Sequence, residues 1–314
     1  MKNMKAFFAT PVSKHLIDKF NKAGISVDFG TTTELLDRAE LVEIINKYDI
    51  IKPQFLQKLD TDMMANINTP KVYGSMSIGL DHIPSDWFAN PLIKIANIKT
   101  ANAVSVAEHI FALILALSKR IYESNALVID GKGHRNHIIE RDRPNDISGK
   151  TIGLIGAGNI TREVIRFATV FNMRILCYTK NPKKHQDLND KVEFVSLDNL
   201  LKESDIINIS VPLNDETKYL VSKDKIELMK TTAVFINTSR TNTVDTKALL
   251  EYADKHPNFY VGLDIDLCEH RELFMKYRHN VIVTPHTAGI SKEAISRMEE
   301  ELVENIICQA KYTQ

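Results

Sequence analysis

Short apolar runs alternate with amphipathic segments along the first hundred residues of the chain. Strands are predicted where a short run is mostly apolar and rich in β-branched or aromatic residues. These runs are 5–10, 25–29, 50–51, 71–75 and 93–96. Between them, apolar residues recur at helical spacing in 12–23, 41–47 and 55–67. Strands that alternate with helices predict a parallel, doubly wound sheet, so this part is expected to form an α/β domain of its own.

A long apolar helix is predicted next, and a second alternating series follows it. Residues 105–122 are apolar on every side in the middle, so this helix is expected to be buried all round, between domains or subunits. Residues 130–146 are polar and are expected to form a surface loop. The predicted strands beyond them are 151–155, 174–178, 192–195, 206–211, 233–237, 260–264 and 281–284. The predicted helices are 159–171, 197–202, 223–229, 246–253 and 292–311, and the last can return to the first domain.

A glycine turn organises the second series. Gly156 and Gly158 follow the strand 151–155 directly and precede a helix. Gly156 can form the tight turn, Gly158 lets the backbone approach a pyrophosphate, and the helix offers free N–H groups to the phosphates. Thr161 stands where a third glycine is expected, so an ordinary βα turn is the alternative. The strand before the turn and the helix after it favour a dinucleotide site.

Composition and charge restrict the class of protein. The 314 residues are enough for two domains, and 44% hydrophobic with 25% charged residues is typical of a globular protein in water. Lys plus Arg and Asp plus Glu number 40 each, so the formal net charge is zero. This balance gives no indication of nucleic acid or an anionic membrane as a partner.

Cysteine usage and the apolar runs indicate a cytoplasmic protein without a metal site. The three cysteines form no CxxC pair, lack metal-ligand spacing and fit a reducing cytosol. The longest apolar run, 110–117, is too short for a membrane span. The first fifteen residues contain too short an apolar run for a signal peptide.

Three reactive side chains follow predicted strands of the second series. Ligands of an open α/β sheet lie beyond the carboxyl ends of its strands. Arg240 could hold a carboxylate in a bidentate fork. His286 could exchange a proton with a hydroxyl near neutral pH, and Glu269 could raise its basicity. Each residue alone has an ordinary interpretation, as a helix cap, a structural histidine or a solvated acid. Their common placement after a dinucleotide turn favours a catalytic set.

Over nearly its whole length, the sequence resembles the D-isomer-specific 2-hydroxyacid dehydrogenases. The motifs occur in order at 71–82, 102–120, 149–160, 204–217, 228–245, 263–269 and 284–289. The resemblance implies an α/β protein with two doubly wound parallel-sheet domains. One is a flavodoxin-like substrate domain of residues 1–101 and 287–314, and the other is a Rossmann NAD(P)-binding domain of residues 102–286. It also implies a homodimer that interconverts a small 2-keto acid, of the glyoxylate, hydroxypyruvate or phosphoglycerate type, and its D-2-hydroxy acid.

The same resemblance assigns roles to individual residues. The implied catalytic residues are Arg240, Glu269 and His286. The substrate carboxylate is expected to meet backbone amides around Ser77, Ile78 and Gly79, together with Arg240. The implied cofactor contacts are Asn159, Ile160, Val211, Pro212, Thr217, Thr238, Ser239 and Asp264, in addition to the two turn glycines.

The sequence departs from the family pattern in ways that leave the substrate open. Thr161 and Thr241 replace glycines, and residues 130–146 lack the tryptophan common there in the family. A dinucleotide-binding regulator or partner-binding protein that kept the fold without turnover is the alternative from another class. The intact catalytic set argues against it, because a binding module has no need of a proton donor.

The residues after 174–178 favour NADP over NAD as the cofactor. An NAD-specific site usually ends this strand in an acidic residue that binds the ribose hydroxyls. Here Thr179 stands at that position, and Lys180, Lys183 and Lys184 follow closely. Loss of a repelling carboxylate and gain of cations act in the same direction. The alternative is a solvated basic loop, with NAD bound without an acidic anchor.

Overall fold

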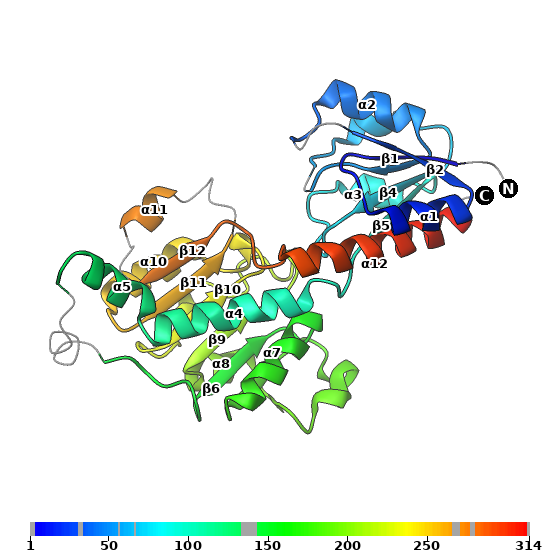
Figure 1. The fold of residues 1–314 in the computed structure, drawn as a ribbon. Helices are drawn as coiled ribbons and strands as arrows, with labels where there is room; N and C mark the ends of the chain where they lie inside the picture. Colours follow the sequence, from blue (N-terminus) through cyan, green and yellow to red (C-terminus); the bar gives the residue numbers. More distant parts are fainter. Residues whose placement is uncertain are drawn as a thin grey trace. The chain divides into compact units, whose positions relative to one another are not determined.

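The computed structural model describes residues 4–30, 34–55, 57–65, 67–132, 143–265, 271–276 and 280–312. The chain divides into two compact units (Figure 1). Unit 1 comprises residues 1–102 and 292–314, and unit 2 comprises residues 103–291. The sequence places the boundaries after residues 101 and 286. The C-terminal helix packs within the first unit, as expected from its amphipathic pattern.

Unit 1 is built on a five-stranded parallel sheet of order β2-β1-β3-β4-β5. The strands are β1 (Met4–Phe8), β2 (Ile25–Phe29), β3 (Ile50–Lys52), β4 (Lys71–Ser75) and β5 (Ile93–Asn97). The helices are α1 (Lys14–Lys22), α2 (Arg38–Lys47), α3 (Ser85–Ala89) and α12 (Lys292–Lys311). Neighbouring residues of a strand belong to the cores on opposite faces of the sheet. Phe8 packs with α1 and α12, and Phe7 packs with α2 and α3. This strand order is the flavodoxin-like one, with its switch point between β1 and β3.

The predicted helix at 55–67 is wrong. In its described part only η1 (Thr61–Met64), a short 3₁₀ helix, forms. The buried side chain of Gln57 donates to the Leu36 carbonyl and accepts from the Leu36 amide, both at 2.9 Å. The Trp87 indole donates to the Asp60 carbonyl at 3.2 Å. These hydrogen bonds engage the Gln57 side chain and the Asp60 carbonyl with residues far along the chain, and they outweigh the helical periodicity of the segment.

Unit 2 is built on a seven-stranded parallel sheet of order β12-β11-β10-β9-β6-β7-β8. The strands are β6 (Thr151–Ile155), β7 (Arg174–Tyr178), β8 (Glu193–Phe194), β9 (Ile206–Ile209), β10 (Val234–Asn237), β11 (Tyr260–Asp264) and β12 (Val281–Thr284). The order is that of a Rossmann sheet, with its switch point between β6 and β9. Ligands of such sheets bind in the crevice at the switch point.

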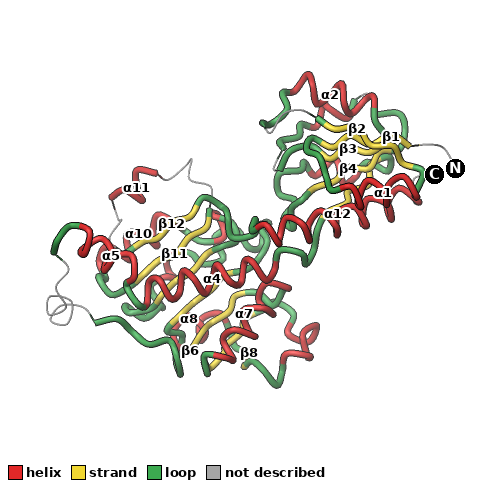
Figure 2. The backbone as a smooth tube through the Cα atoms, viewed as in Figure 1, coloured by secondary structure: helices red, strands yellow, loops and turns green. Residues whose placement is uncertain are grey.

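Helices cover both faces of this sheet (Figure 2). The helices α4 (Ala103–Ser118) and α7 (Asn159–Val170) contribute to one core, and α8 (Leu197–Glu203) and α10 (Thr246–Lys255) contribute to the other. The remaining helical segments are α5 (Ile121–Ile129), η2 (Pro182–Leu188), α9 (Lys223–Ile226), η3 (Thr241–Thr243) and α11 (Arg271–Lys276). The core on the α4 side contains Ile110, Ile114 and Val164, all fully buried.

The apolar helix ends earlier than predicted. It ends at Ser118, because Arg120 adopts a left-handed conformation (φ 53°, ψ 37°) before α5 begins. Within a single chain Val104 is 37% exposed, and Glu108 and Ala112 lie on the same exposed stripe, so burial of this face against another domain or subunit stays a prediction. A helix that is apolar on every side but covered on only part of its surface retains an unpartnered face.

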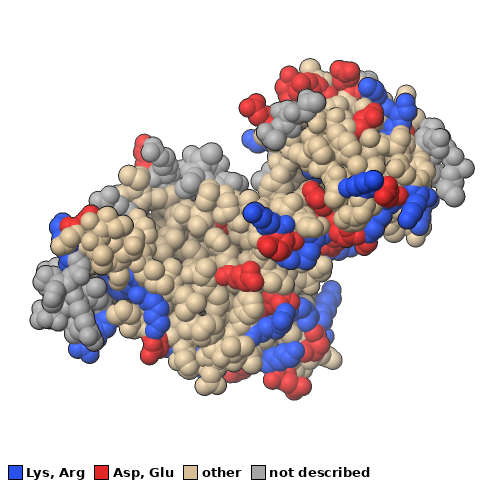
Figure 3. All heavy atoms as spheres, viewed as in Figure 1, with Lys and Arg blue, Asp and Glu red and all other residues tan. Residues whose placement is uncertain are grey.

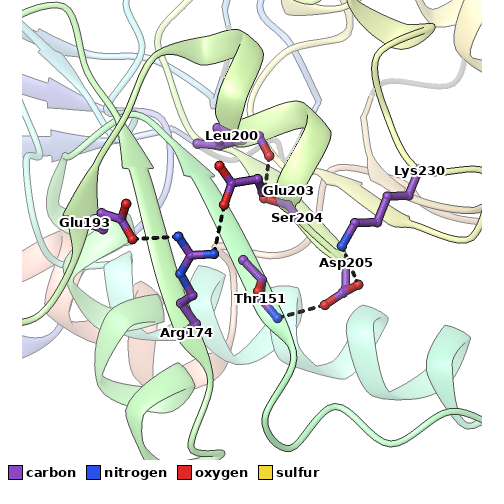
Figure 4. Close-up of polar contacts among 8 residues, drawn as sticks. All are labelled: Thr151, Arg174, Glu193, Leu200, Glu203, Ser204, Asp205 and Lys230. Carbon is purple, nitrogen blue, oxygen red and sulfur yellow. Dashed lines mark hydrogen bonds and ion pairs between the residues drawn. The ribbon is translucent and has the colours of Figure 1, made fainter.

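Ion pairs hold the amino edge of the unit 2 sheet (Figure 4). Asp205 accepts from the Thr151 amide at 2.9 Å and from the Lys230 ammonium at 2.8 Å. Arg174 forks between Glu193 at 2.7 Å and Glu203 at 2.8 Å. Burial alone would raise the pKa of the Asp205 carboxyl, but these hydrogen bonds outweigh it and the net pKa is lowered. The contacts of Asp205 with Thr151 and Lys230, called the Asp205 clamp below, therefore join the amino ends of β6 and β9 at the edge opposite the glycine turn.

Candidate active site

The glycine turn lies at the switch point of the unit 2 sheet. Gly156 has φ +106°, and a side-chain carbon there would lie 2.5 Å from the Ser210 carbonyl oxygen at the end of β9. Only glycine satisfies both the positive φ and the close approach of the two strand ends. Gly158 caps α7, and a Cβ placed there would meet no atom within 4 Å. The turn is therefore tight against β9 and open at the start of the helix.

The first turn of α7 has the properties of a phosphate-binding helix end. The N-cap residue, Gly158, has no side chain that could bond the first amides, and both Gly158 and Asn159 are exposed. Uncapped amide groups and the helix dipole favour an anion at this position. Thr161, which replaces the third glycine, is 1% exposed, and within the described chain its hydroxyl has no hydrogen-bond partner. The replacement is thus accommodated inside the fold and leaves the helix end accessible.

The loop after β10 is held by one buried amide. The Asn237 carboxamide accepts from the Ser239 amide at 2.9 Å and donates to the Arg240 carbonyl at 3.0 Å. Thr238, between them, is 8% exposed, and its hydroxyl has no acceptor or donor among the described residues. A buried hydroxyl without a partner is unusual in a folded protein. Its position at the carboxyl end of β10 fits a ligand group that completes the site.

The loop after β9 closes through Thr217. Its hydroxyl donates to the Pro212 carbonyl at 2.5 Å, and its amide donates to the Asn214 side chain at 3.0 Å. The segment 211–217 is therefore a fixed turn at the carboxyl edge, with Val211 half-buried and Pro212 exposed. Glu216 projects from this turn and forms an ion pair with Lys180, which follows β7. Thr179 lies half-buried beside Lys180.

The catalytic candidates of unit 2 share one edge of the sheet. Arg240 follows β10 and His286 follows β12, with β11 between these two strands. Both side chains are half-buried. His286 has φ +55°, a left-handed conformation that is uncommon for a residue with a side chain. Glu269, the third predicted member, lies outside the described residues.

Asp264, at the end of β11, is fully buried and its carboxylate is engaged within the protein. Oδ1 accepts from the Thr284 hydroxyl at 2.5 Å and from the Thr287 amide at 2.8 Å. Oδ2 accepts from the Ala288 amide at 2.8 Å. The predicted contact of this residue with the cofactor stays a prediction. The observed contacts tie the carboxylate to the loop that carries His286.

The predicted substrate loop of unit 1 follows β4. Ser77 is buried, and its hydroxyl lies 2.7 Å from that of Ser75. Asn97, which ends β5, donates to the carbonyls of Ser77 and Ile78, each at 3.3 Å. Within the described chain the amides of Ile78 and Gly79 donate to no acceptor. The loop thus presents two amides, as required for binding a carboxylate oxygen.

Two polar residues with structural roles at these loops went unassigned in the sequence. Asn237 follows an apolar strand, where a ligand-binding residue is also expected. The sequence therefore gave no indication that its carboxamide holds the loop together instead. His109 is a polar residue within an apolar helix, and in the structure its Nε2 lies 2.9 Å from the Thr284 hydroxyl. The only sequence signal for His109 is its place in the Val-Ala-Glu-His start of that helix.

In the described ranges, no group of three or more His, Cys, Asp or Glu side chains is placed to hold a metal ion. None of the described helices is long and apolar enough to span a bilayer. Basic and acidic side chains are interspersed on the face drawn in Figure 3.

The sequence has relatives over most of its length. Residues 111–288 match the family described as D-isomer specific 2-hydroxyacid dehydrogenase, NAD binding domain. The hydroxypyruvate reductase of Thermotoga maritima is 34% identical over 281 residues, which cover 88% of this chain and 89% of that protein. The glyoxylate reductase of Pyrococcus furiosus is 30% identical, covering 87% of this chain and 82% of that protein.

Solved structures agree with this relationship. An acyclic imino acid reductase in complex with NADPH and D-Arg has a TM-score of 0.86 and 27% identity, covering 99% of this chain and 98% of its own. The D-lactate dehydrogenase of Aquifex aeolicus, complexed with NAD and lactic acid, has a TM-score of 0.79 and 29% identity. That match covers 98% of this chain and 96% of the dehydrogenase.

Proposed function

Because this chain belongs to the D-isomer specific 2-hydroxyacid dehydrogenase family, we propose that it interconverts a small 2-keto acid and its D-2-hydroxy acid with a nicotinamide cofactor. The observation that carries the proposal is the shared edge of the unit 2 sheet. It combines an uncapped helix start after a glycine turn with Arg240 and His286 on nearby strand ends. The curated relatives favour glyoxylate or hydroxypyruvate as the substrate, and a phosphoglycerate-type acid is a further candidate.

The residues of unit 2 fit a dinucleotide. The amides at the start of α7 would bind the pyrophosphate, and the fixed loop 211–217 would border the nucleotide. The Thr238 hydroxyl is buried and has no hydrogen-bond partner among the described residues. The bound cofactor supplies or accepts the hydride. The proposed set of cofactor contacts is completed by Asn159, Ile160, Val211, Pro212, Thr217 and Ser239. The cofactor contact of Asp264 stays a prediction.

The chain's own side chains would bind the substrate and move a proton. Arg240 would hold the carboxylate in a two-pronged fork. The amides of Ile78 and Gly79 in unit 1 stay predicted substrate contacts. During reduction His286 would donate a proton from its imidazole to the carbonyl oxygen, and in the reverse direction it would accept the hydroxyl proton. Glu269 would hold His286 in its protonated form.

NADPH is the proposed preferred cofactor. Thr179 lacks the negative charge that would repel a 2′-phosphate, and Lys180, Lys183 and Lys184 lie beside it on exposed positions. Lys180 already pairs with Glu216, so its charge is available only in competition with that carboxylate. NAD remains the alternative, because the structural relatives include complexes with both cofactors.

A homodimer is proposed from the apolar surface of unit 2. None of the residues of α5 is buried, although the helix is largely apolar. Tyr122 is 65% exposed and Ile129 is 75% exposed. An amphipathic or apolar helix without a buried residue needs a partner surface to be stable in water. A second copy of the chain is the partner we propose.

Oxidation of NADPH and NADH with a panel of 2-keto acids tests the function. We expect turnover with glyoxylate or hydroxypyruvate, and His286→Gln should lower kcat by roughly a hundredfold or more while cofactor affinity stays nearly unchanged. A protein that binds NADPH but turns over no keto acid would instead be a binding or regulatory member of the family.

The panel also separates keto-acid from imino-acid reduction. The likeness to an acyclic imino acid reductase over 99% of this chain makes an imine the second candidate substrate. Each keto acid is therefore assayed with and without an added amine. Turnover that requires the amine, with formation of an amino acid, would replace the keto acid by the imino acid as the substrate class.

A further inference from the structure

We propose that His109 is a positioning residue for the proton donor His286, acting through the Thr284 hydroxyl and the Asp264 carboxylate. The inference rests on the proposed function, because it takes His286 as the proton donor. It concerns the Val-Ala-Glu-His motif at the start of α4, to which the proposed mechanism gives no role. All four residues lie in unit 2.

The contacts form one continuous chain from α4 to the catalytic loop. His109 Nε2 lies 2.9 Å from Thr284 Oγ1, and Thr284 Oγ1 lies 2.5 Å from Asp264 Oδ1. The two Asp264 oxygens then accept the amides of Thr287 and Ala288, both at 2.8 Å. His286 therefore lies between Thr284 and Thr287, and both of these residues bond to the same carboxylate.

The donor and the acceptor of each hydrogen bond follow from the number of protons that each group can donate. The Thr284 hydroxyl has a single proton, which it donates to Asp264 Oδ1 at 2.5 Å. The Thr284 oxygen must then accept from His109, which fixes a proton on His109 Nε2. His109 consequently orients the hydroxyl toward Asp264 and away from the Leu263 carbonyl, which lies 3.3 Å from the same oxygen.

This orientation matters because the backbone of His286 is held in an unfavourable conformation. A residue with a Cβ is disfavoured in the left-handed region, so the surrounding contacts must maintain this conformation. The His286 amide turns back to the Thr284 carbonyl at 3.0 Å, and the next two amides bond to Asp264. Loss of the Thr284 hydroxyl contact frees one end of this turn and lets the imidazole leave the position from which it transfers a proton.

Matched pairs of variants isolate the hydroxyl and the imidazole. Thr284→Val removes the hydroxyl at nearly constant volume, and Thr284→Ser retains it. His109→Leu removes the donor, and His109→Gln places an amide N–H near the original Nε2. We expect Thr284→Val and His109→Leu to lower kcat by roughly tenfold or more, with the NADPH dissociation constant changed less than about twofold. The Ser and Gln variants should recover most of kcat.

Two readouts distinguish positioning from a general loss of structure. The solvent deuterium isotope effect on kcat should rise in the Val and Leu variants, because proton transfer becomes more strongly rate-limiting. Hydrogen exchange of a peptide covering 284–290 should become faster in the same variants, while exchange in β6 and β9 stays unchanged.

The outcomes separate this inference from the proposed function. If the wild type turns over keto acids but the Val and Leu variants keep wild-type kcat and isotope effect, the positioning role is wrong and the proposed function stands. Equal kinetic losses in Thr284→Val and Thr284→Ser would also overturn it, because the hydroxyl would then be irrelevant. If the wild type reduces neither keto nor imino acids, the proposed function fails and the catalytic role of His109 fails with it.

Discussion

Lys180 and Glu216 face each other at the edge where the adenosine end of a dinucleotide is expected. Their side chains are 69% and 66% exposed, so the ion pair is worth little in stability. Its effect is on charge instead, because a lysine paired with a carboxylate attracts a 2′-phosphate less strongly. Cofactor preference at this site is therefore a balance among three groups: Thr179, Lys180 and Glu216.

Substitution of these two residues should shift cofactor preference in opposite directions. Lys180→Ala should weaken NADPH binding by roughly tenfold and leave NADH binding nearly unchanged, since the ammonium addresses only the phosphate. Glu216→Gln should strengthen NADPH binding by releasing Lys180. Fluorescence titration measures both dissociation constants without turnover. Lys191→Ala, at another exposed lysine of unit 2, is the control, and tighter NADH than NADPH binding by the wild type would contradict the proposal.

At the level of residues, the sequence indicated which side chains are candidates for catalysis but not which contacts hold them in place. Arg240 and His286 stand in recognisable motifs, and the structure places both after strands of one sheet. The role of His109 depends on its contact with Thr284, 175 positions further along the chain. The role of Asn237 depends on its contact with Arg240, 3 positions further along. No local pattern predicts a hydrogen bond across 175 residues, so only the folded chain reveals it.

Among the elements, the amino ends of β6 and β9 are joined by the Asp205 clamp (Figure 4). Asp205→Asn should destabilise the protein by about 1–2 kcal/mol at neutral pH, since it weakens hydrogen bonds to a charged partner. Urea unfolding at pH 7 measures the difference. Asp190→Asn, at an exposed position, is the control and should have little effect.

The same clamp predicts a pH dependence with a definite sign. The pKa of folded Asp205 lies below its usual value of 3.8, so the unfolded chain binds this proton more readily. The stabilisation is fully present above about pH 4 and is lost as pH falls through the folded pKa. The stability difference between wild type and Asp205→Asn should therefore shrink on acidification below pH 4. A difference that stays constant down to pH 2 would show that charge at Asp205 plays no part.

Element prediction was reliable where one face of a strand or helix is buried and unreliable where distant groups compete for the backbone. The strands 25–29, 71–75, 260–264 and 281–284 and the helix 292–311 have the predicted bounds. The helix predicted at 55–67 fails because Leu36 and Trp87 take polar groups from that segment. The helix predicted at 105–122 breaks near Arg120. The break was not predicted because an arginine, and not a glycine, adopts the left-handed conformation there.

At the scale of the whole molecule, the exposed face of α5 leads to a prediction about assembly. Val128 and Ile129 are 64% and 75% exposed, and none of the residues of α5 is buried. We expect a dimer in light scattering at micromolar concentration, and Val128→Asp with Ile129→Asp should shift it toward monomer because a charge in an apolar interface is unfavourable.

Val170→Asp is the matched control for that experiment. Val170 is 83% exposed on α7, which is otherwise packed against the sheet, so a charge there should leave assembly unchanged. A wild type that is monomeric at all concentrations would contradict the dimer. A dimer unaffected by the α5 substitutions would place the interface elsewhere on the chain.

The sequence by itself determined the class of fold, the order of the elements and the candidate catalytic residues of this protein. Those features are local: alternation and helical spacing report which face of an element is buried, and Gly156 reports a turn that no other residue adopts. Only the tertiary structure decided the break at Arg120, the missing helix before residue 67 and the burial of Asp264 beneath the His286 loop. Each of these depends on hydrogen bonds or packing between residues far apart in the chain, whose energies are comparable to local preferences and so can reverse them.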